Sequence, residues 1–302
     1  MAIDLKRRGF AQTILGVEAD PVAAEAVKTM GLADELVSLE ECVDRSDIIV
    51  VAVPVGTAVK MLPAILDRIQ MPGQAGHDGS GHDGAGYDGS GYDGAGHDVM
   101  ADSDRPSKKI VIDVCSTKEH ICNAVKYHPA RKQFVCTHPM AGTEYSGPWA
   151  AQPGLFDGRA CIFADQEESA PWAVQTILEL YACLNMRPIF MNSSSHDVHT
   201  AYVSHISHVT SFALALTVLD KEKDEKHIFD LASGGFSSTV RLAKSNADMW
   251  IPILTQNHDN VLQVMDTYIE KMKQFRDAVD SYDEQALRKL IEDANRIKRI
   301  IR

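Results

Sequence analysis

The stretch "DIIVVAVP", residues 47–54, is a run of apolar, mostly β-branched residues that ends at a proline. A strand that is apolar on both faces is typical of a parallel sheet covered by helices on both sides. The segment that follows, residues 57–69, places apolar side chains at helical spacing despite an internal Pro63. A buried strand followed at once by an amphipathic helix predicts one unit of an alternating β/α fold.

The same alternation recurs along the first two thirds of the chain. Further strands are predicted at residues 13–20, 109–116, 134–139, 160–164 and 187–192, and further helices at 22–31, 118–127 and 171–184. Strands that alternate with helices predict a doubly wound, Rossmann-like parallel sheet. We therefore expect an α/β dinucleotide-binding domain over residues 1–192.

Strand signals vanish from residue 196 onward. Residues 198–219 are apolar nearly all round, and residues 261–301 repeat apolar side chains every three to four positions. This pattern predicts an all-helical domain over residues 193–302, with its central helix buried between neighbours, including across a dimer interface.

The bulk composition is that of a soluble enzyme. The chain is 45% apolar, and its N-terminus "MAIDLKRRGF" is charged and lacks the apolar core of a signal peptide. We therefore expect a cytoplasmic protein with no membrane-spanning segment. The six cysteines are scattered without CxxC spacing, which favours reduced thiols over disulfides or zinc.

The net charge of −12 is mostly local. Residues 71–104 contain seven Asp and no Glu, Lys or Arg, so the rest of the chain carries only −5. No basic patch invites a nucleic acid, and we exclude that class of partner.

Residues 76–98 repeat the pattern [His/Tyr]-Asp-Gly-[Ser/Ala]-Gly, and ten of the protein's 20 glycines lie between 73 and 96. Such a segment cannot bury enough apolar surface to order itself, so we interpret residues 71–107 as a low-complexity, flexible insertion. Capture of a metal by the His/Asp register is the alternative. It is disfavoured because the repeat lacks the apolar position that calcium-binding β-rolls use to build a core.

Ligands of a doubly wound sheet bind outside the carboxyl ends of its strands. The groups expected there are Glu18, the turn at Pro54 and Val55, Ser116 and His138. Glu18 can accept hydrogen bonds from both ribose hydroxyls and repel a 2′-phosphate, which favours NAD over NADP. His138 is a candidate general base because imidazole titrates near neutrality.

The helical part offers further candidates. His196, His199, His205 and His208 cluster in one segment, and the last two share a helix face. No carboxylate or cysteine completes a metal set there, so no metal is predicted. Arg241 is a candidate partner for a carboxylate, which a guanidinium binds through two hydrogen bonds.

Together these stretches resemble the prephenate dehydrogenase family. The matching strings are "GVEADP", "VVAVPV", "DVCSTK", "THPMAGTEYSG", "LFDGR", "VSHISHV", "GGFSSTVRLAKS" and "MW", in family order over the chain apart from 71–107. The resemblance implies oxidative decarboxylation of prephenate to 4-hydroxyphenylpyruvate and CO₂ with NAD⁺, in tyrosine biosynthesis, by a homodimer.

The resemblance also implies roles for individual residues. His138 would accept a hydrogen bond from the ring hydroxyl, with Ser116 orienting both groups. Arg241 would bind a substrate carboxylate, with His208 lining the same pocket and His205 nearby.

Thr143 and Glu144 are similar to residues at the mouth of the family's pocket. The cofactor is expected against Glu18, Pro54, Val55 and Asp113.

One departure from the family pattern concerns the N-terminus. The family's first strand and Gly-x-Gly-x-x-Gly turn, whose N–H groups hold the pyrophosphate, do not precede the helix predicted at "MAIDLKRRG". The hypothesis is that the natural start lies upstream of Met1, and for the chain as given we expect weakened NAD binding.

Three alternatives remain open from the sequence. The substrate could be arogenate, in which an amino group replaces the side-chain keto group. The chain could be a truncated relative that binds such ligands without turnover. Stoichiometric metal on the His/Asp repeat would instead indicate a metal-binding protein.

Overall fold

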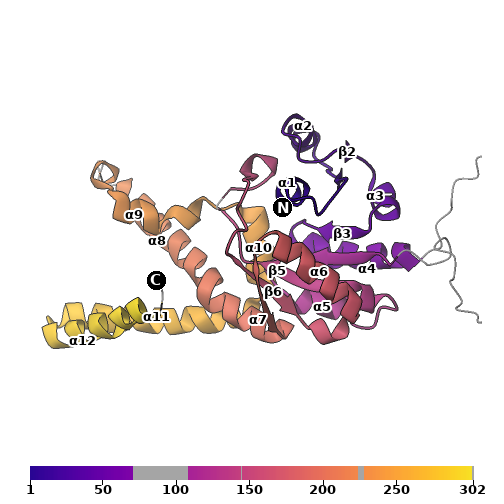
Figure 1. Cartoon of the computed structure of the whole chain (residues 1–302). Helices are drawn as coiled ribbons and strands as arrows, with labels where there is room; N and C mark the ends of the chain where they lie inside the picture. Colours follow the sequence, from indigo (N-terminus) through magenta and orange to yellow (C-terminus); the bar gives the residue numbers. More distant parts are fainter. Residues whose placement is uncertain (71–107, 144, 224–227, 301–302) are drawn as a thin grey trace, which may run out of the picture.

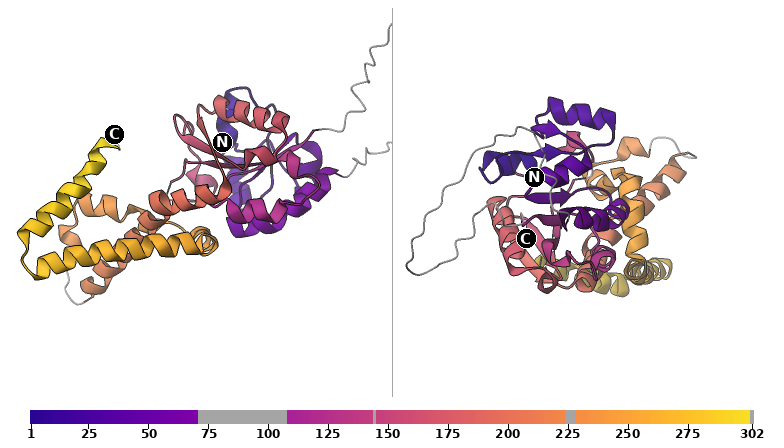
Figure 2. Two further views of the ribbon diagram at one scale, coloured as in Figure 1. Left: turned by 90° about the horizontal axis from the view of Figure 1, so that it is seen from below. Right: turned by 90° about the vertical axis from the view of Figure 1, so that its right-hand side faces the viewer.

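The computed structural model describes residues 1–70, 108–143, 145–223 and 228–300. The predicted insertion at 71–107 and the predicted pocket residue Glu144 lie outside the described residues. Figure 1 shows a sheet surrounded by helices, with the C-terminal helices standing to one side of it. Figure 2 shows the two C-terminal helices, coloured orange to yellow, extending away from the sheet.

The main sheet has the order β3 (Ile48–Val51), β4 (Ile110–Asp113), β5 (Phe134–Pro139), β6 (Ala160–Ala164), β7 (Arg187–Met191). β3, β4 and β5 are parallel, but β6 runs antiparallel to β5. The prediction of an entirely parallel sheet is wrong at this point. Between β5 and β6 the described chain forms only a short 3₁₀ turn, Pro148–Ala150, so no crossover helix carries it back to the starting edge.

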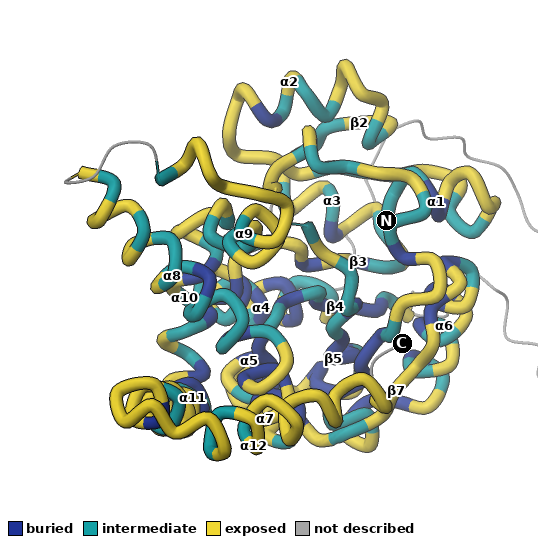
Figure 3. Tube along the Cα trace, turned by 90° about the vertical axis from the view of Figure 1, so that its left-hand side faces the viewer, coloured by how far each residue is buried: buried dark blue, intermediate teal, exposed yellow. Residues whose placement is uncertain are grey.

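Helices cover both faces of the sheet, which confirms the doubly wound arrangement. Along β4, Val111 packs into a core with α4 (Val55–Gln70) and α5 (Glu119–Val125). Its neighbours Ile110 and Ile112 pack into a second core with α6 (Pro171–Cys183). This alternation follows from the two-residue period of a strand. Figure 3 shows the buried segments concentrated along β4, β5 and the helices beside them.

The N-terminal elements form a smaller layer. α1 (Ala2–Arg7) is the helix predicted at the start of the chain, and it precedes β1 (Leu15–Gly16) and α2 (Pro21–Thr29). β1 pairs in parallel only with β2 (Glu35–Leu36), so it is much shorter than the predicted 13–20.

Local sequence explains two details of this layer. A Cβ at Gly16 would lie 2.7 Å from Leu36 Cδ2 and 3.0 Å from Ala33 Cβ, so a larger residue there would require the Leu36 side chain to move. α3 (Leu39–Arg45) was not predicted, although Ser38 followed by Glu41 is a capping-box signature. Ser38 Oγ indeed accepts the Glu41 N–H at 3.1 Å.

All described elements after β7 are helical. They are α7 (Ser193–Thr200), a π-helical turn (Ala201–His205), α8 (Ile206–Glu222), α9 (Gly234–Thr239), α10 (Ala247–Gln256), α11 (His258–Asp280) and α12 (Glu284–Ala294). Short 3₁₀ turns lie at Arg131–Gln133, Gln166–Glu168, Phe229–Leu231, Arg241–Lys244 and Asn295–Arg299.

The central helix α8 is not buried within a single chain. Ser211 is its one buried residue, while Leu216 is 62% exposed and Leu219 48%. The predicted burial of this helix between neighbours is therefore not seen within one chain, and its burial across a dimer interface stays a prediction. The continuous helical stretch Ser193–Glu222 is also long and apolar enough, by length and composition alone, to cross a membrane.

An ion pair beneath the sheet's carboxyl edge yields a stability prediction. Lys118 and Asp113 are both fully buried, and the Lys118 ammonium donates to Asp113 and to the Thr137 carbonyl. Lys118→Met would leave the Asp113 carboxylate buried without its cation, so we expect a loss of about 3–5 kcal/mol in unfolding free energy. Urea denaturation measures this.

The control for this test is Lys126→Met, because Lys126 is exposed at the end of the same helix α5. A control loss within about 0.5 kcal/mol is expected. Equal losses in the two variants would contradict the importance assigned to the buried pair.

Candidate active site

β5 carries His138 to the carboxyl edge of the sheet. Phe134 to Thr137 and Pro139 are buried, whereas His138 keeps part of its surface open. Its Nδ1 lies 2.9 Å from Nε2 of His196 on α7, and the two rings meet edge to face at 5.1 Å between centroids. The strand therefore ends on an imidazole that is attached to the helical part of the molecule.

His196 is attached in turn to Asp197. His196 Nδ1 lies 2.7 Å from Asp197 Oδ1, and both side chains are almost completely buried. The Asp197 carboxylate also accepts the backbone N–H groups of Lys118 at 2.8 Å and Glu119 at 3.0 Å, where α5 begins. A buried carboxylate with three donors is satisfied as an anion.

A second link runs through Asn257, the residue that follows α10. Its Nδ2 donates to the Asp197 backbone carbonyl at 2.7 Å and lies 3.1 Å from His205 Nδ1. His205 belongs to the π-helical turn between α7 and α8, a feature common at functional sites. The Asn257 amide thus connects the π-helical turn, through His205, with the Asp197 backbone.

Trp250 lies between the two histidines predicted for the pocket. The His208 ring stacks on it at 3.5 Å between centroids, and the His205 ring meets it edge to face at 5.9 Å. His208 Nδ1 lies 3.1 Å from the Ser204 carbonyl, so that nitrogen carries the hydrogen and Nε2 its lone pair. His205, by contrast, is buried behind the indole.

All four imidazoles are held neutral by their surroundings. Burial lowers the pKa of His138 well below its ordinary value, and a positive charge on Lys118, His196 or His205 lowers it further. Of these three groups Lys118 is the one that is charged near neutral pH. Burial also lowers the pKa of His196, against the opposing effect of Asp197. His205 falls to a pKa of about 4 through burial, and burial lowers the pKa of His208. A neutral imidazole is the form that accepts a proton.

Asp113 does not reach the surface. It is fully buried, and its carboxylate accepts the N–H groups of Cys115 at 3.1 Å and Thr137 at 3.2 Å besides pairing with Lys118. Burial lowers the pKa of Lys118, but the attraction of Asp113 outweighs it, so the ammonium stays charged. A cofactor cannot touch this carboxylate in this arrangement, and we assign Asp113 to support of the strand ends instead.

The remaining predicted residues around His138 are only partly brought together. Ser116 lies on the bend after β4, partly exposed, and its hydroxyl makes no hydrogen bond to His138 or to any other described residue. The Thr143 hydroxyl accepts the Tyr145 N–H at 3.3 Å in the loop after β5. Arg241 is exposed on a 3₁₀ turn, close enough to His208 for its charge to lower that pKa.

The other predicted cofactor residues follow β1 of the two-stranded sheet and β3 of the main sheet. Glu18 is exposed after β1, and its Oε1 accepts the Asp20 N–H at 2.9 Å. Pro54 is exposed after β3, and its carbonyl accepts the Thr57 N–H at 2.8 Å in the first turn of α4. Val55, the first residue of that helix, is buried.

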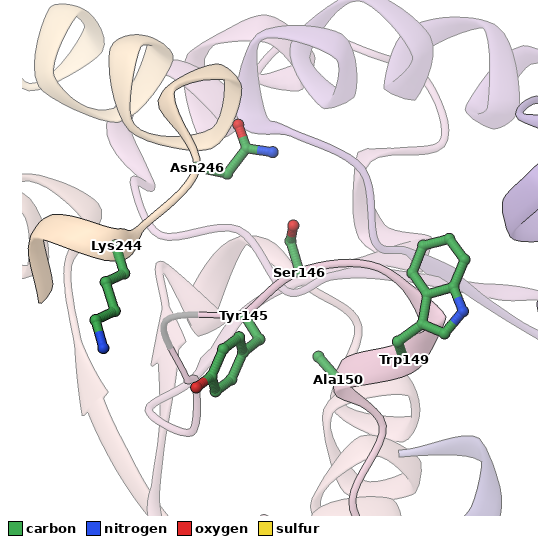
Figure 4. Close-up of a pocket in the computed structure, with 6 residues that line it drawn as sticks. All are labelled: Tyr145, Ser146, Trp149, Ala150, Lys244 and Asn246. Atoms are coloured by element: carbon green, nitrogen blue, oxygen red, sulfur yellow. The ribbon is translucent and has the colours of Figure 1, made fainter. Parts of the chain in front are cut away.

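A cavity of about 440 Å³ opens between the loop after β5 and the segment after Arg241. It is lined by Tyr145, Ser146, Trp149, Ala150, Lys244 and Asn246. Figure 4 shows the two segments facing each other across this space, with Ser146 pointing toward Asn246. The loop that follows the His138 strand and the turn that carries Arg241 therefore share one opening.

No cluster of three or more His, Cys, Asp or Glu side chains able to hold a metal occurs among the residues that the structure describes. The His/Asp repeat, on which the metal alternative depends, lies outside those residues.

Two family models match the chain. "Prephenate dehydrogenase, nucleotide-binding domain" matches residues 1–72 and 100–189, and "Prephenate dehydrogenase, dimerization domain" matches residues 192–293. This chain belongs to the prephenate dehydrogenase family. The resemblance carried by "THPMAGTEYSG" and "GGFSSTVRLAKS" is confirmed.

Curated relatives support this assignment. The chain is 31% identical to a prephenate dehydrogenase of Bacillus subtilis (strain 168) over 189 residues, which are 62% of this chain and 51% of that protein. It is 24% identical to the Lactococcus lactis prephenate dehydrogenase over 300 residues, which are 99% of this chain and 73% of that protein. The chain thus spans about half the length of the Bacillus relative.

Solved structures share the fold. Prephenate dehydrogenase from Aquifex aeolicus, in complex with hydroxyphenyl propionate and NAD⁺, superposes with a TM-score of 0.73 at 23% identity, covering 99% of this chain and 92% of that one. Arogenate dehydrogenase from Synechocystis gives a TM-score of 0.67 at 21% identity, covering 98% and 93%. These neighbours confirm the Rossmann-like sheet with a helical C-terminal part.

The site contains residues that the sequence did not single out. His196 was noted only as one of four clustered histidines, while Asp197, Asn257 and Trp250 were not considered for the site at all. The dipeptide His196-Asp197, in the helix that follows β7, was the available signal. Asn257 offered none, because its place at the end of α10 is set by packing.

The buried histidines predict a loss of stability in mild acid. The folded pKa of His205 is about 4, below the unfolded value of about 6.5, so the unfolded chain binds the extra proton first. The contribution of the neutral His205 to the free energy of unfolding is complete above about pH 6.5 and is lost as pH falls toward about 4. Unfolding free energy measured in urea from pH 7.5 to 4.5 should fall accordingly.

His205→Asn tests the source of this dependence. The amide oxygen of Asn replaces Nδ1 as acceptor for Asn257 but does not titrate, so the variant should show a flatter pH dependence. Exposed His120→Asn, on α5, should keep the wild-type slope. Parallel curves for His205→Asn and wild type would show that His205 does not titrate as assigned.

Proposed function

We propose that this chain is an NAD-dependent dehydrogenase that converts prephenate to 4-hydroxyphenylpyruvate and CO₂ in tyrosine biosynthesis. The observation that carries the proposal is His138, a neutral imidazole at the carboxyl end of β5, held by His196 inside a family match over both parts of the chain. The names of the Bacillus and Lactococcus relatives support it. Hydroxyphenyl propionate and NAD⁺ in the Aquifex structure resemble the proposed product and cofactor.

The residues divide the chemistry between a base and a carboxylate site. His138 accepts the hydrogen bond of the ring hydroxyl and takes its proton as that carbon is oxidised to a carbonyl level. Breaking the bond to the ring carboxylate then releases CO₂ and leaves an aromatic ring. Ser116, on the neighbouring strand end, is the proposed second contact to the hydroxyl.

The other end of the substrate carries a carboxylate. Arg241 binds it through its guanidinium, and His208, stacked on Trp250, lines the same side of the pocket. Thr143 lies in the loop between His138 and the 440 Å³ cavity, at the proposed entrance. His205 is too deeply buried for a direct contact and acts by holding Trp250 and Asn257.

NAD⁺ supplies an acceptor for two electrons and one hydrogen when bound. The exposed Glu18 carboxylate after β1 suits the ribose hydroxyls, and the Pro54–Val55 turn after β3 leads into the first turn of α4. Glu18 fits the adenosine ribose of a dinucleotide, and the Pro54–Val55 turn fits the part of the dinucleotide that crosses the end of β3.

We further propose that the protein is a cytoplasmic homodimer. Each chain would consist of a dinucleotide-binding domain, residues 1–192, and a helical domain, residues 193–302. The exposed apolar residues of α8 and of α11, such as Leu216 and Met272 (52% exposed), suit burial against a second copy. A dimer surface would account for the apolar composition of Ser193–Glu222. The same helical stretch contains Asp197, which accepts a hydrogen bond from the start of α5.

His138→Asn tests the base. Because asparagine cannot take the hydroxyl proton, kcat for prephenate-dependent NAD⁺ reduction should fall by about 10²–10⁴-fold, while KM changes little. The value of kcat/KM should decline only well below the ordinary histidine pKa of about 6.5, because burial lowers the pKa of His138. His120→Asn, a solvent-facing histidine change, is the control; a His138→Asn variant as active as this control would refute the role.

Glu18 is tested by cofactor preference. Glu18→Ser removes a charge-assisted acceptor and the repulsion of a 2′-phosphate, so the ratio of kcat/KM for NAD⁺ over NADP⁺ should drop by roughly 10-fold or more. Glu25→Ser on exposed α2 should leave the ratio unchanged. An unaltered ratio in Glu18→Ser would place the ribose elsewhere.

Arogenate is the second candidate substrate, and the Synechocystis neighbour is named for it. The same assay run with prephenate and arogenate in parallel decides between them by kcat/KM. Binding of either compound in calorimetry without NAD⁺ reduction would favour the non-catalytic alternative.

A further inference from the structure

The hydrogen bonds around Asp197 determine where the hydrogens lie on His196. Asp197 accepts two backbone N–H groups, one from Lys118 to Oδ1 at 2.8 Å and one from Glu119 to Oδ2 at 3.0 Å. A carboxylate in that position accepts hydrogen bonds as an anion and has no hydrogen to donate. His196 Nδ1, 2.7 Å from Oδ1, is therefore the donor.

The same reasoning extends to His138. A neutral imidazole with its hydrogen on Nδ1 has its lone pair on Nε2. His196 Nε2 lies 2.9 Å from His138 Nδ1, so His138 Nδ1 must be the donor in that contact. The lone pair of His138 then lies on Nε2, the ring nitrogen not used by His196.

We propose that His196 and Asp197 are positioning residues that hold His138 in its Nδ1–H tautomer and aim the Nε2 lone pair at the substrate hydroxyl. This inference rests on the proposed function and deepens it. When the hydroxyl O–H bond breaks, its proton forms the N–H bond at His138 Nε2. The new imidazolium keeps its Nδ1–H bond to His196, and the Asp197 anion behind that ring stabilises the positive charge.

The charged groups around His138 determine which anion can compensate the imidazolium. The Lys118 ammonium, from the segment before α5, disfavours a second positive charge on His138, and the neutral His205 ring of the π-helical turn provides no anion to offset it. The Lys118 charge is itself paired with Asp113. Asp197 is thus the anion placed to compensate the imidazolium through His196.

A purely structural role would look different. Asp197 would serve as the acceptor for the first N–H groups of α5, and His196 would only fill space beside it. Replacement of His196 would then alter stability but not the tautomer of His138 or the pH dependence of turnover.

The first experiment does not depend on activity. In the full chain labelled with ¹⁵N-histidine, without ligand at pH 7.5, the nitrogen shifts of His138 should show Nδ1 protonated and Nε2 bare, with His138→Gln identifying the signals. His196→Leu should give a mixture of both tautomers. A wild-type His138 with its hydrogen on Nε2 would overturn the inference.

The second experiment measures steady-state kinetics across pH. His196→Leu should lower kcat about 100-fold with KM within about threefold, and should move the acid limb of kcat/KM to lower pH because the imidazolium loses its acceptor. His196→Gln, which keeps an acceptor oxygen at similar reach, should recover at least about 10-fold of that loss. Exposed His199→Leu, on the same helix, should match wild type.

The outcomes separate the two proposals. Wild-type kcat and pH profile in His196→Leu, or equal loss in the Leu and Gln variants with an unmoved acid limb, would refute the positioning role. If His196→Leu does not fold, the wild-type tautomer and the Gln variant still decide. A wild-type chain that shows the expected tautomer but oxidises neither prephenate nor arogenate would refute only the proposed function.

Discussion

The Asp197 carboxylate joins the two parts of this molecule. It sits near the start of the helical part, yet it accepts the first N–H groups of α5, which packs on the sheet. On its other side it accepts from His196, which contacts His138. Because a buried anion without donors is strongly disfavoured, these bonds fix α7 against the carboxyl edge of the sheet. The site can exist only when both parts are docked in this way.

A second buried charge supports the same edge from below. Lys118 pairs with Asp113 and also donates to the Thr137 carbonyl, one residue before His138. Thr137 Oγ1 in turn contacts the Asp113 carbonyl at 2.6 Å and the Tyr181 hydroxyl at 2.8 Å. Every polar group of this cluster has a partner, so β4 and β5 end in a fixed relative position. That rigidity places the imidazole without requiring a hydrogen bond from Ser116.

The electrostatics of the site follow from the same burial. Removing the imidazoles from water keeps them neutral, while two cations, Arg241 and Lys244, lie on one exposed turn, and Lys244 lines the cavity. A site with a neutral base inside and cations at its opening suits a substrate that carries carboxylates and loses a proton at one hydroxyl. In the proposed function, proton transfer would take place inside the site and recognition of the substrate's charge at its rim.

The sequence by itself determined the class of fold, most of the strands and helices, the family, and the position of His138 at a strand end. These depend on local patterns: apolar runs, helical periodicity, proline and glycine signals, and specific strings such as "THPMAGTEYSG". It could not predict that β6 would turn antiparallel, that Asp113 would be buried against Lys118, or that α8 would lie open along one side. Nor could it pair His138 with His196 and Asp197, or bring Asn257 to them. The His138–His196 and Asn257–Asp197 contacts join residues 58 and 60 positions apart. Only the packing of α7 and α10 against the sheet decides which polar groups lose water together and must therefore satisfy one another.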